Sequence, residues 1–176
     1  MLKRPGLFRR TLLLIVGVLV ASLAFQATPA QAYPPNAGII RNWETGRCLD
    51  SDWNGNVYTL PCNGGNFQNW YINVIIDRCG YGSCHVGSLL INAETGRCIV
   101  SWGAPAYVQT TSDWSDCWIR NQSQNWDTPT SNNYVVTRFK WYPDPNFCLD
   151  SNYAGDVYTM SCNGGGFQNW RADGNL

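Results

Sequence analysis

The sequence has few of the residues on which most catalytic, metal and nucleic-acid sites depend. It contains one histidine, His85, and only 14% of its 176 residues are charged. A Ser/His/Asp catalytic site would therefore have to use that single histidine. No cluster of lysine and arginine lies within residues 33–176, where eight basic residues stand against twelve acidic ones. We therefore expect no nucleic-acid partner.

The sequence also lacks an apolar run long enough to cross a membrane comfortably. Residues 12–25 form an apolar run of 14 residues, whereas a spanning helix needs about 20. A basic start precedes this run, and the small-x-small pattern Ala30-Gln31-Ala32 follows it, an order typical of a secretory signal peptide. We predict that residues 1–32 are a signal peptide and that the mature chain, 33–176, is secreted and has no membrane span. A membrane anchor is the alternative.

Helical periodicity is absent as well. Short runs with strand character alternate instead with turns rich in glycine, asparagine and proline. In the first part of the mature chain we expect strands at residues 38–42, after Gly46, at 57–60 and at 67–76, with Asn54-Gly55-Asn56 as a hairpin turn. The mature chain has 144 residues, enough for one domain with its own core. We predict a single all-β domain.

One stretch of sequence occurs twice, one hundred residues apart. Residues 48–70 and 148–170 share the same spacings, with 14 residues between two cysteines, then six to a glutamine and eight to a tryptophan. A weaker third copy begins at Cys98 and ends at Trp126. The fixed pitch of fifty residues predicts three structural units, at about 38–86, 87–135 and 136–176. The third unit lacks a last strand that residues 38–40 can supply, so we expect a closed fold with neighbouring termini.

All eight cysteines lie in the mature chain, and an even number in a secreted domain indicates a disulfide framework. The repeat assigns one pair to each copy: Cys48–Cys62, Cys98–Cys117 and Cys148–Cys162. The remaining Cys79 and Cys84 are predicted to close a short local loop. A metal site that includes His85 is the alternative for these two. We predict no metal and no cofactor, and nothing in the sequence indicates an oligomeric state.

Three Gln-x-Trp triplets, each preceded by a cysteine pair, resemble the ricin-type (R-type) lectin family, whose fold is the β-trefoil. The resemblance covers essentially all of the mature chain. It implies a six-stranded barrel capped by a triplet of hairpins, with shallow sugar pockets, up to one in each repeat. Independently of the resemblance, the equivalent tryptophans Trp70, Trp126 and Trp170 are expected to share one core.

The resemblance also implies which residues bind sugar. In the family, the aspartate that follows the first cysteine accepts hydrogen bonds from sugar hydroxyls, and Asp50 and Asp150 stand there. Val100 stands there in repeat two and cannot accept, so we expect sites in repeats one and three only. Aromatic rings can cover the apolar face of a sugar, and amides add direction. The ten candidate residues are Asp50, Trp53, Tyr58, Asn63, Gln68, Asp150, Tyr153, Tyr158, Asn163 and Gln168.

Several candidates have a second, structural interpretation. Asn63 and Asn163 begin Gly-Gly turns, and the two glutamines must satisfy their amides beside the core. The four aromatic residues can pack against the adjacent hairpin. The galactose-binding pattern of the family is not intact, because Leu60 and Met160 replace an aromatic residue, and Phe67 and Phe167 replace an asparagine. The kind of sugar therefore does not carry over.

The main functional prediction is a secreted lectin-like protein that binds a glycan or polysaccharide. A glycosidase is a second hypothesis and needs two carboxylates roughly 5–9.5 Å apart. Asp50 and Asp52 could supply them in repeat one, but Asn152 stands in the corresponding place of repeat three. A third hypothesis is a non-catalytic trefoil used for protein contact, such as an inhibitor or toxin-associated subunit.

Overall fold

The computed structural model describes residues 37–76, 86–117, 126–127 and 137–173. These residues all belong to one compact unit, residues 32–176. The predicted signal peptide, the Cys79–Cys84 loop with its alternative metal site, and Gln124 lie outside the described residues. Within the described part, no helix is both long enough and apolar enough to cross a membrane.

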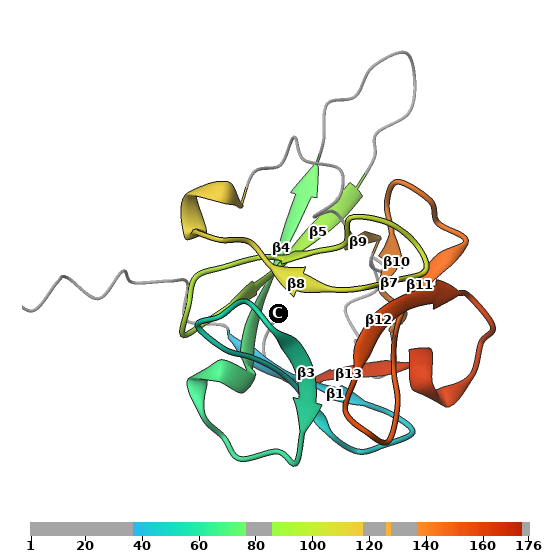
Figure 1. Cartoon of the computed structure of the whole chain (residues 1–176), viewed down its shortest axis with the longest axis horizontal. Coiled ribbons are helices and arrows are strands. Elements are labelled where there is room, and N and C mark those ends of the chain that lie inside the picture. The colour runs from blue at the N-terminus through green and yellow to red at the C-terminus, as the bar shows by residue number, and fades with distance from the viewer. Residues whose placement is uncertain (1–36, 77–85, 118–125, 128–136, 174–176) are drawn as a thin grey trace, which may run out of the picture. The chain divides into compact units, whose positions relative to one another are not determined.

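The unit is built from short β-strands, as predicted (Figure 1). Repeat one contains β1 (Gly38–Asn42), β2 (Cys48–Ser51), β3 (Val57–Leu60) and β4 (Asn69–Ile76). Repeat two contains β5 (Val86–Asn92), β6 (Ile99–Val100), β7 (Ala106–Tyr107), β8 (Gln109–Thr110) and β9 (Trp126–Asp127). Repeat three contains β10 (Lys140–Trp141), β11 (Phe147–Ser151), β12 (Val157–Ser161) and β13 (Trp170–Asp173).

The turn residues explain where the strands of each hairpin end. Between β2 and β3, one oxygen of Asp52 accepts hydrogen bonds from the backbone N–H groups of Asn54 and Asn56 at 2.9 and 3.0 Å. Gly55 has a φ of +89°, which an L-residue with a side chain adopts only with strain. Asn152 performs the same task in repeat three, where it accepts from the N–H groups of Gly155 and Asp156.

One predicted boundary is wrong. Phe67 and Gln68 belong to a 3₁₀ turn, Asn66–Gln68, and β4 begins only at Asn69. The backbone N–H of Gln68 donates to the carbonyl of Gly65 at 3.0 Å, which closes the turn. This turn directs the Gln68 side chain into the interior, where its amide finds polar partners that an extended strand would not offer. Gly166–Gln168 forms the equivalent turn in repeat three.

Strand pairing joins the first and the last strand of the described unit. The first strand, β1, pairs with β13 in the register Ile39–Asp173 to Asn42–Trp170, which places the two ends of the described unit side by side, as expected. An isolated bridge between Thr137 and Trp170 joins the start of repeat three to β13 through backbone hydrogen bonds of 2.7 and 2.8 Å. Direct strand pairings run from β13 through β1, β4, β5 and β9 to β10.

Three hairpins, one from each repeat, contact one another in a cycle, and Figure 1 shows β3, β8 and β12 around a common centre. The tip of each hairpin lies against the outer strand of another. The N–H of Thr59 donates to the Gly155 carbonyl at 2.8 Å, and the N–H of Thr110 donates to the Gly55 carbonyl at 2.9 Å. The N–H of Ala106 completes the cycle by donating to the Thr159 hydroxyl at 3.1 Å.

The three tryptophans form the centre of one core, as predicted. Trp70, Trp126 and Trp170 are fully buried, and each indole N–H donates to a backbone carbonyl, so that burial leaves no unpaired donor. The acceptors are Leu49, Ile99 and Leu149, at 2.9, 3.4 and 3.0 Å. The three disulfides assigned from the repeat, Cys48–Cys62, Cys98–Cys117 and Cys148–Cys162, are all formed.

Candidate functional site

Asp50 and Asp150 occupy equivalent places on the inner strands of the first and third hairpins. Asp50 lies directly across from Tyr58, and Asp150 directly across from Tyr158. Because directly opposed residues project from the same face of a sheet, each tyrosine lies beside its aspartate. Each aspartate is only 3% exposed. The fold therefore fixes these carboxylates before any ligand arrives.

The buried side chain of Gln68 donates a hydrogen bond to the Asp50 carboxylate. Its amide nitrogen donates to an Asp50 oxygen at 2.8 Å and to the Pro61 carbonyl at 3.2 Å. Its amide oxygen accepts from the backbone N–H of Asn63 at 2.8 Å. Gln68 thus bonds to backbone and to a neighbouring carboxylate, as the sequence suggested. It is fully buried.

Gln168 repeats this arrangement in the third repeat. Its amide nitrogen donates to the Ser161 carbonyl at 3.0 Å, and its oxygen accepts from the N–H of Asn163 at 2.8 Å. Gln168 also lies close enough to Asp150 to act against the burial that raises the pKa of that carboxyl. Like Gln68, Gln168 is fully buried. Both glutamines therefore lie buried at the two aspartates, and their contact with a sugar remains a prediction.

Burial raises the pKa of the Asp50 carboxyl above its usual value, against the opposing effect of hydrogen bonds from Gln68, the Ser51 N–H and Tyr58. Burial raises the pKa of Asp150 in the same way. The hydroxyls of Tyr58 and Tyr158 also have raised pKa values, first through burial and then through the adjacent carboxylate. The tyrosines therefore remain protonated donors at neutral pH.

Trp53 and Tyr153 lie exposed at the hairpin tips. Trp53 is 57% exposed and meets the ring edge of Phe67 with centroids 6.2 Å apart, while Tyr153 is 64% exposed and meets Phe167 at 5.3 Å. The two phenylalanines replace the family's asparagine, and the structure uses them to support these aromatic side chains. Each packs by one edge and leaves most of its surface in solvent, and stacking on a sugar remains a prediction.

Asn63 and Asn163 are exposed turn residues. The side-chain oxygen of Asn63 accepts from the Gly65 N–H at 2.8 Å, and that of Asn163 accepts from the Gly165 N–H at the same distance. Their backbone N–H groups hold the glutamine oxygens. Their turn-forming role is therefore present in the structure, and contact with a sugar remains a prediction.

Repeat two has the framework without the carboxylate. Val100 is buried at the position of Asp50, and a valine side chain offers no acceptor. Two aromatic residues that the sequence did not single out are strongly exposed in the described part of this repeat: Trp102 at 72% and Tyr107 at 70%. Their signal in the sequence is the longer segment between Cys98 and Cys117, which carries them outside the repeat pattern.

Asp52, the second carboxylate of the glycosidase hypothesis, is occupied in the turn. Burial acts to raise its pKa, but hydrogen bonds from Asn56 and Asn54 outweigh burial and lower the pKa. Its second oxygen accepts from the Asn56 side chain at 2.7 Å. Asp52 is thus a turn-capping residue. Among the residues that the structure describes, no group of three or more His, Cys, Asp or Glu side chains is placed to hold a metal.

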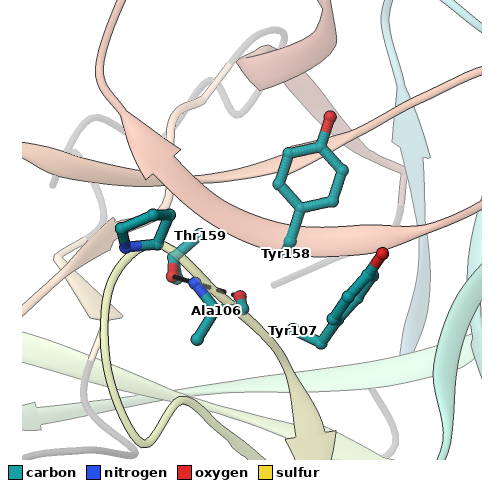
Figure 2. A pocket seen from close by; sticks show the side chains of 5 residues that line it. Ala106, Tyr107, Tyr158 and Thr159 are labelled. Atoms are coloured by element: carbon teal, nitrogen blue, oxygen red, sulfur yellow. Dashed lines mark hydrogen bonds between the residues drawn. The ribbon is translucent and has the colours of Figure 1, made fainter.

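A pocket of about 290 Å³ lies where β12 meets β7, between repeats three and two. The rings of Tyr107 and Tyr158 form one part of it, with centroids 6.3 Å apart and planes at 83°. Figure 2 shows both rings projecting in the same direction from neighbouring strands. Its other lining residues are Pro105, Ala106 and Thr159.

Solved structures share this architecture. A designed three-fold symmetric protein, ThreeFoil, is 21% identical, matches 77% of this chain and 96% of its own, and has a TM-score of 0.58. A ricin B-like lectin from Macrolepiota procera, solved in complex with lactose, is 20% identical, with 78% and 94% of the two chains matched and a TM-score of 0.57. This unit is a β-trefoil.

A third β-trefoil match belongs to a larger enzyme. An endo-β-galactosidase from Clostridium perfringens that releases GlcNAcα1-4Gal is 21% identical with a TM-score of 0.60, and the match covers 80% of this chain but 32% of the enzyme. The trefoil of residues 32–176 therefore corresponds to about a third of that protein. No protein-family model matches the chain. At these identities the likeness establishes the fold alone.

Proposed function

We propose that this β-trefoil is a secreted, non-catalytic carbohydrate-binding protein with one site in repeat one and another in repeat three. The observation that carries the proposal is the repeated group of a carboxylate, a tyrosine and a glutamine, Asp50–Tyr58–Gln68 and Asp150–Tyr158–Gln168. Each group lies beside an exposed aromatic residue at a hairpin tip. Three disulfides support secretion, and the lactose complex of the Macrolepiota procera lectin supports a glycan ligand.

The proposed chemistry follows from the remaining hydrogen-bonding capacity. An ionised carboxylate offers about four acceptor positions, and the hydrogen bond from Gln68 uses one of those on Asp50. A sugar hydroxyl can take a position that remains. The Tyr58 hydroxyl, which lies opposite Asp50 on the neighbouring strand, can bond to a second sugar hydroxyl. Adjacent hydroxyls of one sugar therefore match the Asp50–Tyr58 pair, and the apolar face of a sugar matches the ring of Trp53.

Two sites on one rigid unit favour polymers and cell surfaces over free sugars. Each site is shallow, and its carboxylate shows little surface to solvent, so we expect weak binding to one sugar unit. Simultaneous use of both sites on a polysaccharide would raise the overall affinity without any new contact, provided that the ligand spans both sites. Polysaccharides and clustered surface glycans are therefore the proposed ligands.

A glycan and polysaccharide binding screen tests this function. Wild-type protein is compared with Asp50→Asn/Asp150→Asn, in which each amide is close in shape to the carboxylate but cannot accept at both ends. We expect wild-type protein to bind and the double variant to lose binding at least about tenfold, since hydrogen bonds to charged groups contribute about 1.5–3 kcal/mol each. Asp52→Asn is the matched control, because repeat three carries Asn152 there. Undiminished binding by the double variant would refute the proposed sites.

Protein contact is the second candidate function, and the exposed Trp102 favours it. This tryptophan is 72% exposed in the repeat without a carboxylate, and exposed aromatic residues are common at protein interfaces. If the trefoil acts through a protein partner, the glycan screen gives no ligand, a partner is recovered by affinity capture, and Trp102→Ala abolishes that capture. Capture that survives Trp102→Ala would reject this surface.

A further inference from the structure

The row of side chains that begins at Asp150 continues beyond its own repeat. Asp150 on β11 lies across from Tyr158 on β12, and Tyr158 lies across from Tyr107 on β7. Directly opposed residues on neighbouring strands share one face of a sheet, and neighbouring strands are about 4.8 Å apart. The three side chains therefore form a row of roughly 10 Å across three strands. Its last member, Tyr107, belongs to repeat two.

The equivalent rows of the other repeats end differently. In repeat one, Asp50 and Tyr58 are followed by Asp156 of repeat three, which is exposed. In repeat two the row contains no carboxylate and no aromatic residue: it is Val100, Gln109 and then Asn56. Each row thus takes its third residue from the hairpin tip of another repeat. The two candidate sites are alike in their first two residues and differ in the third.

Tyr107, the third residue of the repeat-three row, lines the pocket between β12 and β7. Tyr107 and Tyr158 form an aromatic corner with rings at 83°, and Pro105 and Ala106 extend it with apolar surface. Tyr107 is 70% exposed, so its ring is available to a ligand. The pocket adjoins the proposed sugar site, because Tyr158, which lines the pocket (Figure 2), lies directly across from Asp150.

We propose that the repeat-three site binds two consecutive sugar units, the first at Asp150 and Tyr158 and the second against Tyr107. This inference rests on the proposed function of the Asp150 site. An aromatic ring recognises the C–H face of an uncharged sugar, and the row is longer than a single hexose. In repeat one the carboxylate of Asp156 replaces the ring and offers no stacking surface, so that site binds a single unit. Repeat two, which lacks a site of its own, therefore contributes specificity to its neighbour.

The test compares saccharide lengths when only the repeat-three site works. The Asp50→Asn protein is titrated with the mono-, di- and tetrasaccharides of the β-1,4-glucose, β-1,4-xylose, β-1,4-mannose and β-1,4-galactose series. We expect the disaccharide of a recognised series to bind more tightly than its monosaccharide. Adding Tyr107→Ala should weaken disaccharide binding about fivefold, as expected for the loss of one aromatic contact, and leave monosaccharide binding unchanged. Tyr107→Phe, which keeps the ring, should restore the disaccharide affinity.

Matched variants separate the possible failures. Adding Tyr107→Ala to the Asp150→Asn protein should leave saccharide binding unchanged, because only the repeat-one site then remains. Since Tyr107 is exposed, neither Tyr107→Ala nor Tyr107→Phe should shift the unfolding midpoint of the protein that carries it. Equal binding of mono- and disaccharide, or equal weakening of both by Tyr107→Ala, would overturn the two-unit site and leave the proposed function standing. Failure of wild-type protein to bind any glycan in the functional screen would overturn both.

Discussion

At the residue scale, one side chain joins the framework of the trefoil to its candidate site. Gln68 connects the turn at Asn63, the carbonyl of Pro61 and the carboxylate of Asp50. Its amide satisfies three groups that would otherwise be unpaired close to the core. Gln68 thus helps to fix the orientation of an aspartate eighteen residues earlier in the chain.

Removal of Gln68 should therefore affect stability as well as binding. Gln68→Ala removes the donor to the buried Asp50 carboxylate, and a buried polar group left without its partner costs about 1–3 kcal/mol. We expect urea unfolding to show a loss of about 1–3 kcal/mol in the free energy of unfolding. Gln168→Ala should also lower this free energy, because Gln168 makes the same two bonds to backbone groups as Gln68. A loss below about 0.5 kcal/mol in either variant would mean that the network is not stabilising.

Acidification should weaken sugar binding earlier than an ordinary aspartate would predict. The pKa values of Asp50 and Asp150 are raised above 3.8 by burial, and a protonated carboxyl no longer accepts two hydroxyls. When binding is measured at a series of pH values from about 7 to 3.5, we expect the affinity for sugar to fall to half of its neutral value at a pH above 3.8. If the affinity for sugar stayed constant down to pH 3.8, the ionised carboxylates could not be the groups that accept the sugar hydroxyls.

The raised pKa values of Asp50 and Asp150 affect the stability of the fold in the opposite direction from sugar binding. Between 3.8 and the raised pKa, the folded protein binds more protons at Asp50 and Asp150 than the unfolded chain does. These two groups therefore favour folding at low pH, and this contribution is lost as the pH rises through their folded pKa values. Asp52, whose pKa is lowered, acts in the opposite direction. Unfolding measured beside the binding titration separates lost binding from lost structure.

At the element scale, the hairpins of neighbouring repeats hold one another in place. Arg47 of repeat one donates to the Tyr153 carbonyl at 3.2 Å, and Arg97 of repeat two donates to the Trp53 carbonyl at 2.6 Å. The Arg97 guanidinium also lies 5.8 Å from the Trp53 ring centre, within range of a cation–π interaction. Phe147 occupies the corresponding place in repeat three. The two hairpin tips with candidate stacking residues are therefore the ones that an arginine supports.

Gly155 is the position where this contact between hairpins leaves no room. A Cβ there would meet the Thr59 carbonyl oxygen at 2.8 Å, and its φ is +104°. Gly155→Ala must therefore displace one hairpin tip, and we expect a loss of about 2–4 kcal/mol in the free energy of unfolding. Gly46→Ala is the control, since φ there is +68° but the space is open, and its cost should be about 1–2 kcal/mol. Equal losses in urea unfolding would show that steric contact plays no part.

At the scale of the whole molecule, the sequence predicted what local signals and the repeat determine. Turn residues such as Asn54 and Gly55 marked the strands, the repeat assigned three disulfides, and the recurring tryptophans marked the core. The 3₁₀ turn at Phe67 was missed, because the aromatic residue suits a strand and only the partners of Gln68 decide otherwise. The pairing of Tyr158 with Tyr107 was missed because it depends on how hairpins of different repeats pack, which neither local sequence contains.

The repeats therefore share a scaffold while their sites differ. Equivalent core and turn residues preserve the three-fold arrangement, and the exposed side chains at the hairpin tips, Trp53 and Tyr153 among them, vary from repeat to repeat. Asp52 and Asn56 of repeat one correspond to Asn152 and Asp156 of repeat three, so the same turn bond survives with the charge moved to the other partner. This exchange is what places a carboxylate, Asp156, at the end of the repeat-one row.

The central claim is that two carboxylates create two sugar sites on one trefoil. Calorimetric titration with the shortest oligosaccharide found by the glycan screen tests it most directly, in the wild type, in Asp50→Asn, in Asp150→Asn and in the double variant. We predict two binding sites per chain in the wild type, one in each single variant and none in the double variant. A wild-type stoichiometry of one or three, or binding that survives in the double variant, would contradict the claim.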